Sequence, residues 1–144
     1  MTTTETFVLD LDPKVPLADR IRAGKYYYVD PAITPEHFTL TLSGKREVIL
    51  FDPHGAVSSE EMIRRMKADH CVPATLDDCL VMGRQFPDRQ CINPIVFLGM
   101  VWRGPGGYRH VPVLDDWFGG RGLYLYWFDD DWHDFYRFAA VRES

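Results

Sequence analysis

The 144-residue chain has few cysteines, no long apolar run and no surplus of basic residues. Cys71, Cys79 and Cys91 show no CxxC spacing, which argues against a zinc site or a disulfide framework, so we expect reduced thiols. No stretch approaches the roughly 20 apolar residues of a membrane span. The N-terminal residues lack the basic and then apolar pattern of a secretory signal. We therefore expect a single cytoplasmic domain, residues 1–144, with no membrane partner.

The charge balance and the missing motifs exclude further classes. The chain has 16 Lys and Arg and 21 Asp and Glu, which gives a net charge of -5, whereas nucleic-acid binding needs a surplus of basic residues. The chain contains no GxSxG, P-loop, HExxH or GxGxxG motif. "GPGGYRH" is rich in glycine but has no phosphate-binding lysine, and we interpret it as a hairpin turn. We expect no nucleic-acid partner, no cofactor and no catalytic residues.

Local patterns in the first two thirds predict a hairpin and helices. Residues 1–35 are interrupted by prolines and hold one short helix, "LADRIRAG". Alternation in "HFTLTLSGKREVILFD" predicts a hairpin that turns at "SGK". Ser58 and Glu61 have capping-box spacing at the start of a helix over 58–70. Thr75 is the expected N-cap of a second helix, over 74–86.

The last third of the sequence is rich in aromatic residues, and its pattern predicts β-strands. Thirteen of the twenty aromatic residues lie at or beyond Phe97. "IVFLGMVW" predicts a strand buried on both faces, and Pro112 in "YRHVPVL" predicts an edge strand or a bulge. "DDWFGGRG" predicts a loop, followed by strands at "LYLYWF" and "DFYRFAAVR". The expected fold is α+β, with an extended and helical segment over 1–35, a hairpin plus two helices over 36–93, and an antiparallel sheet over 94–144.

Two interpretations remain open for "RGLYLYW". By the two-residue period of a strand, Leu123, Leu125 and Trp127 share one face, and Gly122, Tyr124 and Tyr126 share the other. If the leucines face the core, the tyrosines form an exposed surface of the kind that binding proteins use. The alternative is a strand covered on both sides, with the tyrosines under a loop.

The acidic turn "FDDDWHD" offers an enzyme hypothesis. Carboxylates beside an imidazole can bind divalent metals, so Asp129, Asp131, His133 and Asp134 could serve a small metal-dependent hydrolase. Alternate residues of a strand point to opposite faces, however, and not all of these carboxylates can converge. A polar turn between two strands is the simpler interpretation.

The segments "SSEE", "IRRMK", "PATL", "INPIVFLGMVW", "HVPVL" and "GGRGLYLYWFDDDWHDFYRFAAVR" together resemble the variable proteins of diversity-generating retroelements. In these systems a reverse transcriptase copies a template with adenine-directed errors into the 3′ end of a target gene. The closing "RFAAVR" is similar to the last strand of the C-type lectin-like fold that such proteins share with formylglycine-generating enzymes. The resemblance therefore implies two helices packed on a twisted antiparallel sheet, with an N-terminal hairpin.

The resemblance also implies which residues contact the ligand. The exchanged positions fall in the gaps of the framework "L-L-WFD-DW----RF-AVR" and in the preceding loop. Trp117 cannot arise from an AAC codon mutated at its adenines, so it is either framework or a fixed contact. The implied contact residues, with 108–110 less firmly placed than the others, are Tyr108, Arg109, His110, Asp115, Asp116, Trp117, Phe118, Gly122, Tyr124, Tyr126, Asp130, His133 and Phe135, and Gly119 is a further candidate.

The implied function is ligand binding without catalysis. Leu123, Leu125, Trp127, Trp132 and Phe138 are expected to hold the scaffold while the contact side chains change identity. Exposed substitutions cost little stability. Aromatic anchors among carboxylates suit a protein partner with basic or apolar groups, so we expect a protein surface as the ligand. A structural or immunity-type interaction protein with one fixed partner is the third hypothesis. The pattern sets neither the ligand's identity nor the oligomeric state.

Overall fold

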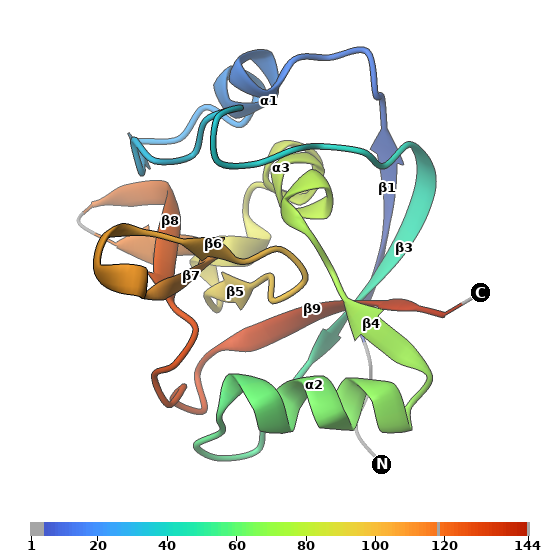
Figure 1. Cartoon of the computed structure of the whole chain (residues 1–144). Helices are drawn as coiled ribbons and strands as arrows, with labels where there is room; N and C mark the ends of the chain where they lie inside the picture. Colours follow the sequence, from blue (N-terminus) through green and yellow to red (C-terminus); the bar gives the residue numbers. More distant parts are fainter. Residues whose placement is uncertain (1–4, 118, 144) are drawn as a thin grey trace.

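The computed structural model describes residues 5–117 and 119–143. Within these residues the chain forms three α-helices and a large, mostly antiparallel sheet, so the α+β class is confirmed (Figure 1). The helices are α1 (Leu17–Ala23), α2 (Ser59–Ala68) and α3 (Leu76–Gln85), with short 3-10 turns η1 (Arg89–Cys91) and η2 (Pro105–Gly107). The strands are β1 (Glu5–Leu11), β2 (Tyr28–Val29), β3 (Gly44–Phe51), β4 (Cys71–Pro73), β5 (Ile95–Val96), β6 (Trp102–Arg103), β7 (Arg109–Trp117), β8 (Gly120–Trp127) and β9 (Arg137–Arg142).

The sheet runs in the order β1-β3-β9-β5-β7-β8-β2, with β4 beside β9 and β6 beside β7. Two pairs are parallel: β5 with β9, and β2 with β8. The parallel pairs join segments that are far apart in the sequence. The N-terminal segment therefore reaches the edge of the aromatic-rich part of the sheet.

The sheet separates two hydrophobic clusters, because successive residues of each strand point to opposite faces. Leu50, Ala139 and Leu123 lie in the cluster that α1 and α3 cover. Ile49 and Ala140 lie in the other cluster, with Met62 and Met66 of α2. Figure 1 shows α2 on one side of the strands and α3 on the other.

Both helices predicted from capping signals are present. The side chain of Ser58 accepts a hydrogen bond from the Glu61 amide at 3.1 Å, which satisfies a free donor at the start of α2. At the start of α3 the Asp78 carboxylate accepts from the Thr75 amide at 3.0 Å. The Asp78 carboxylate also accepts from Nε and Nη2 of Arg46, both at 3.0 Å, which ties α3 to β3.

The predicted hairpin over 37–52 is wrong. β3 pairs along its length with β1, and residues 38–43 form no strand. Phe38, Leu40 and Leu42 instead pack a loop against the α1 and α3 side of the core. The first antiparallel pair, β1 with β3, thus joins strands that are separated in the sequence by residues 12–43.

The predicted strand over 95–102 is also wrong in extent. Its first two residues form β5 at the centre of the sheet, and its last one begins β6. The break lies at Gly99, whose amide donates to the Ala74 carbonyl at 2.8 Å. A Cβ at Gly99 would lie 2.4 Å from the Pro73 carbonyl oxygen, so only glycine lets the backbone pass this close.

Three further expectations need correction. Most of the predicted loop over 115–122 belongs to strands, since β7 continues to Trp117 and β8 begins at Gly120. The last strand begins only at Arg137. Pro112 lies in a central strand and not at an edge, but its carbonyl accepts from Phe97, just beyond the end of β5. Proline has no backbone N–H, and here none is needed, because the hydrogen-bond ladder between β5 and β7 has already ended opposite Pro112.

Candidate functional site

The β7–β8 hairpin carries most of the predicted contact residues. In its register Asp115 pairs with Gly122 and Val113 with Tyr124. Directly opposed residues share a face, and alternate residues along a strand do too, so Tyr126 and Trp117 join them on this face. Val111 and Val113 belong to the α2-side cluster, which identifies the face as the α2 side of the sheet.

The leucine-and-tyrosine alternation is correct for Leu123, Leu125, Tyr124 and Tyr126. Leu123 and Leu125 are buried, whereas Tyr124 and Tyr126 are half-buried on the opposite face. Trp127 departs from the expectation, because 47% of its surface is exposed. It ends β8 beyond the leucine core and stacks on Tyr108, with ring centroids 5.0 Å apart and planes 3° apart. Trp127 is therefore not part of the buried scaffold, while Trp132 and Phe138 are.

The aromatic side chains on this face form one continuous aromatic row. We define the row as Tyr28, Tyr124, Tyr126, Tyr136, Phe135 and His133, in spatial order. Its successive ring centroids lie 5.1, 5.5, 6.4, 4.6 and 5.5 Å apart. Four of the six residues come from the predicted contact set. Phe135 and His133 are exposed, and Tyr28 is 43% exposed at the other end of the row.

Asp115 is bound to the middle of the aromatic row. The Tyr126 hydroxyl donates to the Asp115 carboxylate at 2.7 Å. Partial burial, followed by this hydrogen bond and the Asp115 charge, raises the pKa of Tyr126 strongly. Burial and the charges of Asp115 and Asp130 also raise the pKa of Tyr136. Tyr126 and Tyr136 therefore keep their phenolic protons well above neutral pH.

Gly122 lies beneath the ring of Tyr124. A Cβ at Gly122 would lie 2.3 Å from Cε2 of Tyr124, so any other residue must displace that ring. The Tyr124 hydroxyl reaches back to the Trp117 carbonyl at 3.3 Å. Gly122 is buried and does not offer the exposed, independently exchangeable position that the resemblance implied.

The remaining predicted contact residues are not all on this face. His110 and Asp116 lie out of phase with Tyr126 and Asp115, on the opposite side of the hairpin. His110 is placed beside Trp102, with ring centroids 5.4 Å apart. Tyr108 and Arg109 lie at the end of the hairpin away from Trp117. Phe118 lies outside the described residues, and Gly119 is exposed between the two strands.

The acidic turn is fixed by its neighbours. Arg109 binds the Asp129 carboxylate and lies 4.3 Å above the Phe128 ring. Buried Trp132 donates from Nε1 to the Ser59 hydroxyl at 2.8 Å, and Ser59 donates to the Phe128 carbonyl at 2.6 Å. Among residues 5–117 and 119–143, no three His, Cys, Asp or Glu side chains are grouped as a metal site. Asp129, Asp131, His133 and Asp134 thus form no such group in the described part of the chain.

Two side chains that the sequence did not indicate hold the hairpin from the other side. Gln90 is 1% exposed and donates to the carbonyls of Asp115 at 2.8 Å and Gly122 at 3.1 Å. Its side-chain oxygen accepts from Arg121 at 3.0 Å. Gln90 thus bridges β7 and β8 through their backbones and makes no use of the contact side chains.

Arg121 extends this support to three further segments. It donates to the carbonyls of Pro87 at 2.9 Å, Gly24 at 2.6 Å and Gly83 at 2.7 Å. Its guanidinium also lies 5.0 Å from the centre of the Tyr26 ring. Arg121 therefore connects β8 to α3 and to the tyrosine-rich N-terminal segment, whose Tyr28 begins the aromatic row.

Comparison with protein-family models, with curated proteins and with solved structures finds no match. No helix among the described residues is long and apolar enough to cross a membrane. The geometry of the aromatic row and its support is therefore the basis for a functional proposal.

Proposed function

We propose that this chain is the variable protein of a diversity-generating retroelement, a non-enzymatic binding protein with a C-type lectin-like fold. Its contact surface is the aromatic row together with Asp115, Trp117 and the exposed carboxylates of the turn, Asp130, Asp131 and Asp134. The ligand is the surface of another protein. No catalytic group or cofactor is needed for this role.

The proposal rests mainly on the hydrogen bonds that hold the backbone of the β7–β8 hairpin and the following turn. Gln90, itself held by Arg121, binds the main-chain carbonyls of Asp115 and Gly122. Ser59, itself held by the Trp132 indole, binds the main-chain carbonyl of Phe128 at the start of the turn. Main-chain contacts do not depend on which side chain a residue carries. The side chains of Tyr124, Phe135 and His133 can therefore change while the strand geometry persists.

The chemistry of the surface indicates the kind of partner. Rings that are partly exposed supply large contact area at low entropic cost. The half-buried Arg109 is bound to Asp129 and Glu60. Within the described chain, no ion pair is formed by Asp115, Asp116, Asp130, Asp131 or Asp134. A partner with basic or apolar side chains would complement these rings and carboxylates.

Randomising the contact positions tests the proposal directly. A library at Tyr124, Tyr126, His133 and Phe135 is displayed and sorted for folded chains with proteolysis. A matched library randomises Leu123, Leu125, Trp132 and Phe138. We expect most members of the first library and few of the second to survive, because the first set is partly exposed and the second is buried. Equal survival of the two libraries would contradict the proposal.

The neighbouring DNA supplies an independent test. A near-identical template repeat beside a reverse-transcriptase gene, with copies that differ only at the contact positions, is the expected result. The hydrogen bond from Tyr126 to Asp115 favours the alternative of a fixed partner, since it couples two positions that diversification would treat separately. Identical residues at the contact positions in every related copy would support that alternative.

A further inference from the structure

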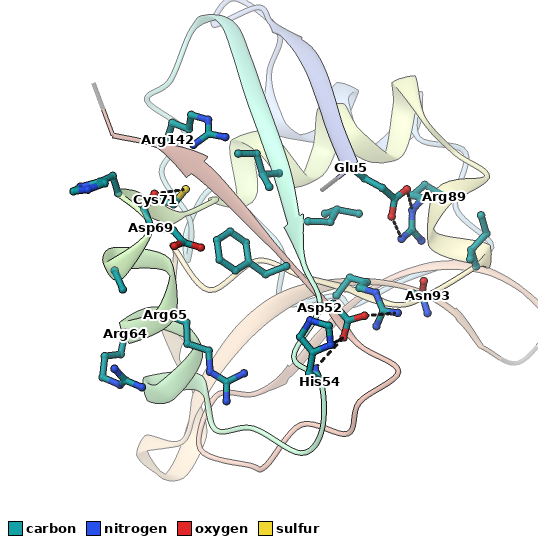
Figure 2. A pocket seen from close by; sticks show the side chains of 17 residues that line it. Glu5, Asp52, His54, Arg64, Arg65, Asp69, Cys71, Arg89, Asn93 and Arg142 are labelled. Atoms are coloured by element: carbon teal, nitrogen blue, oxygen red, sulfur yellow. Dashed lines mark hydrogen bonds and ion pairs between the residues drawn. The ribbon is translucent and has the colours of Figure 1, made fainter. Parts of the chain in front are cut away.

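A groove of about 900 Å³ shares no lining residue with the aromatic row and is not used by the proposed function (Figure 2). Its walls come from α2, the loop after β3, η1 and β9, so segments far apart in the sequence meet there. Phe51, Ala68 and Ile92 supply apolar surface. The polar and charged lining residues are Glu5, Asp52, His54, Arg64, Arg65, Asp69, His70, Arg89, Asn93, Arg137 and Arg142.

The groove is positively charged although the protein is acidic. Five arginines and three carboxylates among the described residues line it, which leaves two positive charges, whereas the whole chain carries -5. Two of the carboxylates already have arginine partners: Glu5 binds Arg89, and Asp52 lies 3.4 Å from Arg137. Asp69 lines the groove without an arginine partner in the described part of the chain. The lining therefore has guanidinium groups in excess of the carboxylates that neutralise them.

Two of these guanidiniums are held in position by backbone oxygens. Arg65 donates from Nη1 to the Pro53 carbonyl at 2.8 Å and from Nε to Glu61 at 2.9 Å. Arg137 donates from Nη1 to the carbonyls of Asp134 and Tyr136, both at 3.0 Å. Backbone acceptors orient a guanidinium without neutralising it. Nη2 of Arg65 and Nε of Arg137 have no acceptor within the described residues and can still donate.

The other three arginines also keep unused donors. Arg64 and Arg65 share the single carboxylate of Glu61, which neutralises only one of their two charges. Arg89 is 8% exposed, and its buried Nη1 has no hydrogen-bond partner within the described chain. No carboxylate of the described residues lies within ion-pair distance of exposed Arg142. Oriented guanidiniums with free N–H groups are a suitable site for an oxyanion.

We propose that this groove binds a phosphate monoester. A phosphate monoester carries a charge of about -1.5 to -2 near neutral pH, opposite in sign to the surplus positive charge of the lining. The planar guanidinium fork pairs with phosphate oxygens in a bidentate manner. Phe51 and Ile92 can contact the organic part of the ester. The site does not depend on the proposed function, since it shares no lining residue with the contact surface.

Titration with inorganic phosphate and phenyl phosphate at constant ionic strength, followed by amide chemical shifts, tests the proposal. We expect saturable shifts at groove amides such as those of His54 and Asp69, with phenyl phosphate bound more tightly. Arg142→Gln should weaken binding about threefold or more, because it removes one exposed charge. Asp69→Asn should strengthen it, because it removes an opposing carboxylate. Both residues are exposed, so neither variant should disturb the fold.

Arg22→Gln is the control, since Arg22 is exposed on α1, outside the groove. This variant should bind phenyl phosphate as the wild type does. Binding affinities are then compared for free phosphotyrosine and for phosphotyrosine within a short neutral peptide. This comparison distinguishes a small-molecule ligand from a phosphopeptide. The proposal fails if the wild type shows no saturable shifts, or if Arg142→Gln, Asp69→Asn and Arg22→Gln all bind with the same affinity.

Discussion

Arg121 donates from Nη2 to the side-chain oxygen of buried Gln90 at 3.0 Å, and through this contact β8 is bound to η1. The same nitrogen donates to the Gly83 carbonyl of α3 at 2.7 Å. A single side chain in the hairpin thus connects the sheet to two separate segments on its other side. The rigidity of the candidate contact surface depends on this pair.

Replacing Arg121 with methionine should destabilise the fold by about 2–4 kcal/mol, because several charge-assisted hydrogen bonds are lost and buried carbonyls stay unpaired. Urea unfolding measures the change. Arg22→Met is the control, since its exposed ion pair with Asp19 should contribute less than about 1 kcal/mol. Similar losses in the two variants would show that Arg121 does not organise the hairpin.

Ser59→Ala should cost about 2 kcal/mol, because it leaves the Trp132 indole N–H and the Phe128 carbonyl without partners in a buried site. Thermal or urea unfolding measures this loss, and tryptophan fluorescence reports the changed surroundings of Trp132. Ser43→Ala, at an exposed position before β3, should have the stability of the wild type. If Ser59→Ala behaves like Ser43→Ala, the turn is not fixed through this hydrogen-bond chain.

Gln85→Ala should promote self-association. Gln85 covers the free edge of β1, since its Nε2 donates to the Val8 carbonyl at 3.1 Å and its Oε1 accepts from the Asp10 amide at 2.8 Å. Uncovered edge strands pair with other chains. Sedimentation velocity at increasing concentration should show larger species than for Arg84→Ala, an exposed neighbour on α3. Identical sedimentation of both variants would mean that the edge is protected in another way.

Stability should fall at alkaline pH. The pKa values of Tyr126 and Tyr136 are raised in the folded chain, so the unfolded chain loses phenolic protons first. Their contribution is fully present below about pH 10, the ordinary tyrosine pKa, and is lost as the pH rises above it. Tyr126→Phe should therefore show a shallower decline in unfolding free energy above pH 10.

At neutral pH, Tyr126→Phe should lower the free energy of unfolding by about 1 kcal/mol, because it removes the hydrogen bond to Asp115. Tyr27→Phe is the control, since 73% of Tyr27 is exposed. An unchanged alkaline slope in Tyr126→Phe would rule out a raised Tyr126 pKa as the cause.

Helices were predictable where their signals are local. Ser58 and Glu61 are three residues apart, and half of the predicted capping box forms, since the Ser58 side chain accepts from the Glu61 amide. The Glu61 carboxylate binds Arg64 and Arg65 instead. The first strand pair was not predictable in this way, because Val48 finds its partner Phe7 across about forty residues. The alternation of Phe38 and Leu40 has the period of a strand, but it reflects a loop that packs on the core.

The candidate site was predictable only in part. Strand alternation placed Tyr124 and Tyr126 on one face, because it depends only on neighbouring residues. The roles of Gln90 and Arg121 could not be predicted, since their acceptors are main-chain carbonyls that carry no sequence signature. The arginines of the groove are scattered from Arg64 to Arg142, so no local pattern indicates their convergence.

The position of Gly122 under the Tyr124 ring has a consequence for any set of related copies. A bulky residue at 122 and an aromatic one at 124 would occupy the same space, so the two identities cannot vary independently. Copies should show statistical covariation between these two positions, with large side chains excluding each other. The effective repertoire of the surface is then smaller than the product of the choices at each site.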